Sequence, residues 1–186
     1  MKEDIQEKIK KGVNNSLICL KKIDIHNDNF IDEIKFINLI RNEYAEDYLH
    51  SSKKYSVNET FKWFFKNCPE YYIIYYSQIP VGYFRTSNYS NENNNIYIGA
   101  DIHSDYCGLK LSYNSYIKFI NQLFEEKKLN KISLEVLSTN TRAINLYKKL
   151  GFVVEGIRRQ EVLKQDQYID SIVMSILKSE WKESSI

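Results

Sequence analysis

Two polar side chains, Asn140 and Tyr147, lie seven residues apart in the segment KISLEVLSTNTRAINLYKKLGF, which spans residues 131–152. The first seven residues alternate as in a strand, a short polar break follows, and an amphipathic helix then ends at Gly151. Tyr147 therefore lies two helical turns along from Asn140. A phenol is protonated at neutral pH and can project from an apolar helix face, so Tyr147 can donate a proton. Taken alone, the two residues have a simpler interpretation as a helix N-cap and a core tyrosine.

The elements that must position these residues follow from the periodicity of apolar side chains. It predicts a strand, two helices, three strands, a helix, a strand, a helix and two closing strands. The first helix is expected over residues 27–44, capped by Asn27 or Asp28, and its apolar stripe contains Ile31, Ile34, Ile37 and Ile40. Ser56 and Glu59 have the spacing of a capping box at the start of the second helix. Either Thr139 or Asn140 caps the last helix.

This order predicts one α+β domain over residues 17–181, with residues 1–16 as a short helix or tail and residues 182–186 as a tail. The 186 residues suffice for one compact core and are few for two. A net charge of +2 provides no strong field for nucleic acid or an anionic membrane. The three cysteines contain no C-x-x-C pair, which argues against a disulfide framework or a metal site.

No apolar run reaches the roughly 20 residues that a membrane helix needs. The charged N-terminal segment MKEDIQEKIKK lacks the apolar core of a signal peptide. We therefore expect a cytoplasmic protein.

The segment SLEVLSTNTRAINLYKKLGF resembles the N-x-x-A-x-x-L-Y-x-x-x-G-F segment of the GNAT superfamily of acyl-CoA N-acyltransferases. The resemblance extends by element order over about residues 17–181. It implies a single GNAT-type domain with a mixed, mostly antiparallel sheet of six to seven strands, about four flanking helices, and a splay between strands 4 and 5. Two further patches, residues 39–64 and IYIGADIHSDYCG, are similar to the branch that acetylates amino groups on nucleotide-linked amino sugars.

The resemblance implies acetyl-CoA as cosubstrate and no metal. Backbone groups near residues 101–103, including Ile102 and His103, would bind the pantetheine arm in the manner of an added strand. Asn140 would reach the CoA arm, and Tyr147 would protonate the departing thiolate. The loop and helix start that follow the fourth strand would bind the pyrophosphate through free N–H groups. These cofactor-binding positions are Cys107, Gly108, Leu109, Lys110, Leu111 and Ser112.

This phosphate loop departs from the family pattern Q/R-x-x-G-x-G/A. Cys107 stands at the polar first position, Lys110 at the first motif glycine, and Ser112 at the second small residue. Glycines there allow the backbone to approach the pyrophosphate closely. Lys110 either supplies a cation to the phosphates or indicates weak cofactor binding, so a non-catalytic GNAT-like module stays an alternative.

The catalytic base has two candidates, Asp101 and His103, which alternate onto one strand face with Tyr97. His103 has a suitable unperturbed pKa, near 6.5. Several family members use a chain of ordered water instead of a dedicated base. His103 also has a simpler interpretation as a strand-end polar residue.

The acceptor candidates are Arg41 and Asn42 at the end of the first helix, together with Arg85. A guanidinium can hold a phosphate in a two-pronged fashion, and Tyr44 or Tyr48 could stack on a base. The expected acceptor is a nucleotide-linked amino sugar, used for a surface glycan precursor in polysaccharide biosynthesis. A protein N-terminus or a polyamine is the alternative acceptor. A homodimer is also possible.

Overall fold

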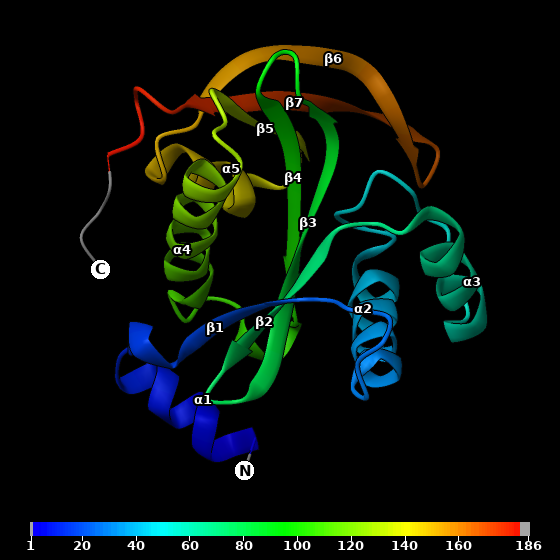
Figure 1. The fold of residues 1–186 in the computed structure, drawn as a ribbon. Helices are drawn as coiled ribbons and strands as arrows, with labels where there is room; N and C mark the ends of the chain where they lie inside the picture. The colour runs from blue at the N-terminus through cyan, green and yellow to red at the C-terminus, as the bar shows by residue number, and fades with distance from the viewer. Residues whose placement is uncertain (1, 183–186) are drawn as a thin grey trace.

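The computed structural model describes residues 2–182, and its elements follow the predicted order with one additional helix at the N-terminus (Figure 1). The α-helices are α1 (Lys2–Lys11), α2 (Phe30–Tyr44), α3 (Val57–Asn67), α4 (Leu111–Glu126) and α5 (Thr141–Lys149). The strands are β1 (Ile18–Lys22), β2 (Tyr71–Tyr76), β3 (Ile79–Ser90), β4 (Asn95–Ile102), β5 (Lys131–Leu137), β6 (Val153–Lys164) and β7 (Gln167–Leu177). The described residues also contain two single turns of 3₁₀ helix, η1 (Asn15–Leu17) and η2 (Ser104–Tyr106).

The seven strands form one sheet in the order β1-β2-β3-β4-β5-β7-β6. Neighbouring strands are antiparallel except β4 and β5, which are parallel. The predicted α+β class and mostly antiparallel seven-stranded sheet are therefore confirmed. No helix in the described part of the chain is long and apolar enough to cross a membrane.

The parallel pair β4–β5 is joined at one end only. Three residue pairs connect the strands, and the last is Tyr97 opposite Ser133. Beyond that pair, residues 98–102 and 134–137 have no partner across the gap, although β5 stays paired with β7 as far as Leu137. The predicted splay between the fourth and fifth strands is thus confirmed.

Helices cover both faces of the sheet, so the domain has three layers. Figure 1 shows α4 and α5 on one face and α2 and α3 on the other. Because successive side chains of a strand point to opposite faces, β3 sends Phe84 into the core beneath α4 and Tyr83 into the core beneath α2. The N-terminal helix α1 also contributes to the first core through Ile9, which is 2% exposed.

The helix starts agree in part with the sequence prediction. The capping box at α3 is confirmed: Ser56 Oγ accepts the Glu59 N–H at 3.2 Å, and Glu59 accepts the Ser56 N–H at 2.8 Å. At α2 the expected cap is wrong, because the helix begins after Asn29 and no side chain caps it. Of the predicted stripe, Ile31 is exposed, since the later start of α2 leaves it in the first turn, outside the core.

Candidate active site

A cavity of about 300 Å³ lies where β4 and β5 separate. The end of β4, the loop after it, the first turn of α4 and one face of α5 line it, and Tyr44 and Tyr48 border it. The predicted site residues in this lining are Asp101, Ile102, Cys107, Gly108, Lys110, Ser112, Asn140 and Tyr147. The predicted residues outside the lining are Arg41, Asn42, Arg85, His103, Leu109 and Leu111.

The edge of β4 presents backbone groups to this cavity. His103 donates its N–H to Val81 O at 2.9 Å, and Asp101 pairs with Tyr83, so these residues direct their backbone groups toward β3. Because the direction alternates along a strand, Ala100 and Ile102 direct their N–H and C=O groups toward the gap left by β5. An extended ligand can therefore pair with β4 there as an added strand.

The carbonyl of Ile102 already has a partner from the opposite layer. Tyr44, the last residue of α2, donates its hydroxyl to Ile102 O at 2.7 Å, and the Cys107 sulfur lies 3.4 Å from that hydroxyl. Burial raises the pKa of Tyr44, which keeps this phenol protonated. Sequence analysis offered Tyr44 only as a stacking residue and missed this contact, because it joins residues 58 apart in the chain.

The loop that connects β4 to α4 has two residues in the left-handed region, Gly108 with φ +79° and Lys110 with φ +59°. Lys110 thus adopts a conformation that glycine favours, at the position where the family motif has glycine. It is also the N-cap of α4, and its side chain makes no capping hydrogen bond. No acidic residue occupies the first turn of α4. The free N–H groups of this turn and the positive end of the helix dipole therefore suit an anion.

Asn140 caps α5, as one of the two predicted caps. Its Oδ1 accepts the N–H of Ala143 at 3.1 Å. The Nδ2 group makes no hydrogen bond with another described residue, and the side chain lines the cavity. Asn140 can thus both cap the helix and donate a hydrogen bond to a ligand.

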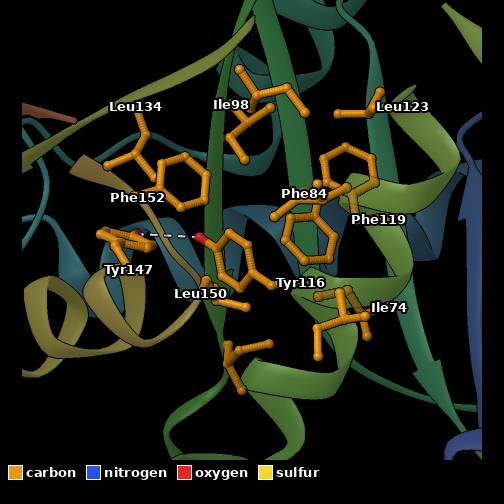
Figure 2. Close-up of a cluster of buried hydrophobic side chains, with 14 of the residues drawn as sticks. Ile74, Phe84, Ile98, Tyr116, Phe119, Leu123, Leu134, Tyr147, Leu150 and Phe152 are labelled. Carbon is orange, nitrogen blue, oxygen red and sulfur yellow. Dashed lines mark hydrogen bonds between the residues drawn. The ribbon is translucent and has the colours of Figure 1, made fainter. Parts of the chain in front are cut away.

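Tyr147 lies at the inner end of the cavity, in contact with a second tyrosine that sequence analysis assigned only to a helical stripe. Tyr116 of α4 donates its hydroxyl to the Tyr147 oxygen at 3.2 Å, and Figure 2 shows the two phenols meeting among the buried side chains. Burial raises the pKa of Tyr147, and the bond from Tyr116 opposes that rise. Tyr147 is therefore protonated at neutral pH, with its own proton free to enter the cavity.

Asp101 lines the cavity from the sheet. Its carboxylate accepts the hydroxyl of Tyr83 at 2.5 Å. Burial raises the pKa of Asp101, against that hydrogen bond and the charges of Arg85 and Arg41. This places a carboxyl group with a raised pKa beside the opening of the sheet.

His103 follows β4 and turns toward other partners. Its Nδ1 accepts the N–H of Asp105 at 3.3 Å, and its ring stacks on Phe36 of α2 with 6.3 Å between centroids. The structure therefore does not bring His103 together with Tyr147 in the cavity lining. Its catalytic role stays a prediction.

Asn42 and Arg41 lie at the last turn of α2, beside the sheet. Both ends of the Asn42 amide hold Tyr55: Nδ2 donates to Tyr55 O at 2.7 Å, and Oδ1 accepts the Tyr55 N–H at 3.0 Å. These bonds fix the loop between α2 and α3. A substrate contact by Asn42 stays a prediction.

The cavity also contains cationic residues that sequence analysis missed. Arg142 and Lys149 both come from α5, and Lys149 Nζ lies 4.6 Å from the centre of the Tyr113 ring of α4. Their spacing of seven residues from one another, in the helix that also carries Tyr147, is the signal that could have identified them. Together with Lys110 they give the cavity mouth a positive charge.

A sheet that opens between a parallel pair of strands, with a helix N-terminus and a tyrosine at the opening, is the arrangement implied by the acyltransferase motif. The family model described as Acetyltransferase (GNAT) family matches residues 37–152. This match covers more than half of the chain, and the chain therefore belongs to the GNAT acetyltransferase family.

Curated relatives match shorter stretches. An uncharacterized N-acetyltransferase, p20 of Bacillus licheniformis, is 31% identical over 90 residues, 48% of this chain and 51% of the relative. The L-amino acid N-acetyltransferase AaaT of Escherichia coli is 35% identical over 51 residues, 27% of this chain and 32% of the relative. The matches thus span about half and a third of the relatives' lengths.

Solved structures share the fold over nearly the whole chain. A spermidine N-acetyltransferase from Vibrio cholerae, in complex with CoA and spermine, has a TM-score of 0.79 at 22% identity, covering 89% of this chain and 98% of that one. A ribosomal-protein-alanine N-acetyltransferase from Brucella melitensis has a TM-score of 0.71 at 13% identity, covering 86% and 99%.

Proposed function

We propose that this chain transfers an acetyl group from acetyl-CoA to a primary amine. The observation that carries the proposal is the open end of the β4–β5 pair, with Tyr147 at the inner end of its cavity. The amine nitrogen attacks the thioester carbonyl carbon, the carbon–sulfur bond breaks, and the thiolate takes a proton. Transfer is direct within a ternary complex, without an acyl-enzyme.

Acetyl-CoA fits this cavity by the chemistry of its lining. The pantetheine arm would pair with the backbone of Ala100 and Ile102, and the Asn140 Nδ2 group would donate to it. The pyrophosphate would lie at the first turn of α4, where amide groups are free and acidic side chains are absent. Lys110 and Lys149 add positive charge near that turn.

Tyr147 is the proposed general acid. Its phenol gives its proton to the departing sulfur, and the hydrogen bond from Tyr116 stabilises the phenolate that remains. The proton that the ammonium group of the acceptor loses goes to Asp101 or to water, and the raised pKa of Asp101 supports the carboxyl group as the base. A backbone N–H of β4 would meet the developing oxyanion.

The acceptor is less defined than the donor. Sequence patches favoured a nucleotide-linked amino sugar, but the relatives reported above act by name on spermidine, a ribosomal protein or L-amino acids. Spermidine and the ribosomal protein match the alternative acceptors of the sequence prediction, a polyamine or a protein N-terminus, whereas L-amino acids were not among them. A polyamine would require carboxylates around the acceptor, yet Glu46 near the end of α2 is paired with Lys54 at 2.6 Å.

A non-catalytic ligand-binding module is the competing function, and Lys110 in the phosphate loop is the observation that favours it. Isothermal titration with acetyl-CoA, followed by a thiol-release assay on a panel of amines, separates the two. Binding with acetyl transfer to an amine supports the enzyme. Binding without transfer to any amine supports the module, and the absence of binding at millimolar acetyl-CoA contradicts the proposed function.

A further inference from the structure

Two arginines on the α2 side of the sheet lack anionic partners. Within residues 2–182, neither Arg41 nor Arg85 forms an ion pair with a carboxylate within 4.0 Å. The Arg85 guanidinium makes no hydrogen bond with another described residue, and its Nε is shielded from solvent without a partner. Burial removes hydration from the Arg85 guanidinium, and Asp101 acts on it through its charge without satisfying its hydrogen-bond donors.

The strand register fixes where Arg85 lies. Tyr71 of β2 is opposite Arg85 of β3, which in turn is opposite Gly99 of β4. These side-chain positions form one row across three strands on the α2 face. A Cβ atom built on Gly99 would come within 2.8 Å of Arg85 Nε, so the guanidinium lies across the strand where glycine leaves space.

The same row adjoins the cavity. Two residue pairs further along, and so on the same face, Tyr83 is opposite Asp101, and Asp101 lines the cavity at the opening of the sheet. The charge of Asp101 acts on both arginines. Its carboxylate, however, accepts the Tyr83 hydroxyl and lies outside ion-pair distance of either guanidinium. Its pKa is raised by burial, which weakens its negative charge further. At this part of the sheet, two arginines thus stand beside one carboxyl group whose charge is weakened.

We propose that the acceptor amine carries an anionic group, a carboxylate or a phosphate, which Arg85 and Arg41 bind while the amine faces Asp101. This inference rests on the proposed acetyl transfer and narrows its substrate class. A guanidinium binds carboxylate and phosphate in the same planar, two-pronged geometry, so both groups satisfy the free donors. A polyamine would instead add positive charge to two cations that are already unpaired.

Matched acceptors that differ in the anionic group test this proposal. We would measure kcat/KM by thiol release for alanine against alaninamide, for O-phosphoethanolamine against ethanolamine, and for spermidine. In at least one of the two pairs, kcat/KM should be about ten-fold or more higher for the anionic amine than for its neutral counterpart. A preference in the alanine pair assigns the carboxylate, and one in the phosphoethanolamine pair assigns the phosphate. If spermidine or the neutral members equal the best anionic amine, the inference is wrong and the acetyltransferase function stands.

Substitutions at and beside Arg85 test whether this residue causes the preference for anionic acceptors. Arg85→Gln should reduce it to near unity while leaving the KM for acetyl-CoA unchanged, and Gly99→Ala should reduce it by displacing the guanidinium without removing its charge. Arg159→Gln, which removes an exposed arginine of β6, is the control. A preference that survives both Arg85→Gln and Gly99→Ala contradicts the assignment to Arg85.

Binding provides a separate readout. Calorimetry on the wild-type protein saturated with CoA compares O-phosphoethanolamine with ethanolamine, and alanine with alaninamide. Tighter binding of an anionic member supports the inference even when no amine is acetylated, a result that would count against the proposed function alone. Equal affinities in both pairs overturn it.

Discussion

At the scale of single residues, the contact between Tyr147 and Tyr116 defines the chemistry of the cavity. Tyr116 donates to Tyr147, so the Tyr147 proton is not used in that bond. The two tyrosines are 31 residues apart in the chain and meet only because α4 and α5 cover the same face of the sheet. The proposed acid, Tyr147, thus lies beside Tyr116, whose hydroxyl can stabilise the phenolate that forms on Tyr147.

Tyr147→Phe should lower kcat by about a hundred-fold, because a general acid contributes factors of this size. The affinity for acetyl-CoA should stay nearly unchanged, since the ring remains in the core. Stopped assays of thiol release and calorimetry measure the two quantities. Tyr89→Phe, an exposed tyrosine of β3, is the matched control. Equal activity of Tyr147→Phe and wild type would remove Tyr147 as the acid.

Tyr116→Phe should lower kcat less, by about ten-fold, because the phenolate left on Tyr147 loses one hydrogen bond. The sign of the pH effect follows from that bond, which opposes the burial that raises the Tyr147 pKa. Without it the Tyr147 pKa rises further, so the alkaline limb of the kcat profile moves to higher pH. A profile with an unmoved alkaline limb argues against this pairing.

At the scale of elements, the junction of loop and helix at Lys110 combines strain with charge. A non-glycine residue in the left-handed region costs about 1 kcal/mol or more. Lys110→Gly should therefore raise the free energy of unfolding by about 1 kcal/mol, whereas Lys110→Ala, which keeps the strain, should not. Urea unfolding measures both variants.

The same two variants separate the backbone from the side chain in cofactor binding. If the Lys110 ammonium group contacts the phosphates, both lose affinity for acetyl-CoA in calorimetry. If Lys110→Gly binds as tightly as wild type, the loop backbone alone serves the phosphates and the proposed cationic role is wrong.

The elements were largely predictable from sequence because their signals are local. Alternation and helical spacing gave the strand and helix order, and Asn140 was one of two expected caps for α5. The start of α2 was mispredicted because Asn27 and Asp28 have cap-forming side chains, whereas the helix starts at Phe30 without one. Local propensity cannot rank such neighbouring caps, since tertiary packing decides between them.

The site was predictable only where it coincides with the local motif. Asn140, Tyr147 and the end of β4 were expected and line the cavity. Arg85 across Gly99 and Tyr44 on Ile102 were not, because each depends on strand register or on helix packing between distant segments. One sequence contains no signal for such pairs.

At the scale of the whole molecule, Glu70, which precedes β2, connects β1, β3 and the C-terminal end of α4. Its carboxylate accepts hydrogen bonds from Lys22 at 2.7 Å, Thr86 at 2.6 Å and Lys127 at 3.1 Å. Burial alone would raise the pKa of Glu70, but these hydrogen bonds outweigh it and lower the pKa to about 2. The ionised carboxylate therefore stabilises the folded state.

Glu70→Gln should lower the free energy of unfolding at pH 7 by about 2 kcal/mol. Because the folded pKa lies below the unfolded value near 4.5, this stabilisation is complete above pH 4.5 and is lost as the pH falls toward 2. Urea unfolding at pH 7 and pH 3 should show the gap between variant and wild type shrinking. Glu92→Gln, in an exposed loop, should show no gap, and a constant gap for Glu70→Gln would contradict the assignment.

The β6 edge of the sheet is a candidate surface for contact with a second copy of the chain. β6 is the last strand and leaves Val153 and Ile157 each 58% exposed. An edge strand with exposed apolar side chains readily pairs with another chain. If the homodimer that the sequence left open forms, we propose this edge as its contact surface.

The hydrogen bond between Tyr44 and Ile102 joins the last residue of α2 to the end of β4. Any ligand that pairs with the Ile102 carbonyl must displace or share the Tyr44 hydroxyl. Tyr44 ends the helix that also carries Arg41, one turn earlier. A ligand that pairs with this carbonyl would therefore also alter the contact that fixes the end of α2 against β4.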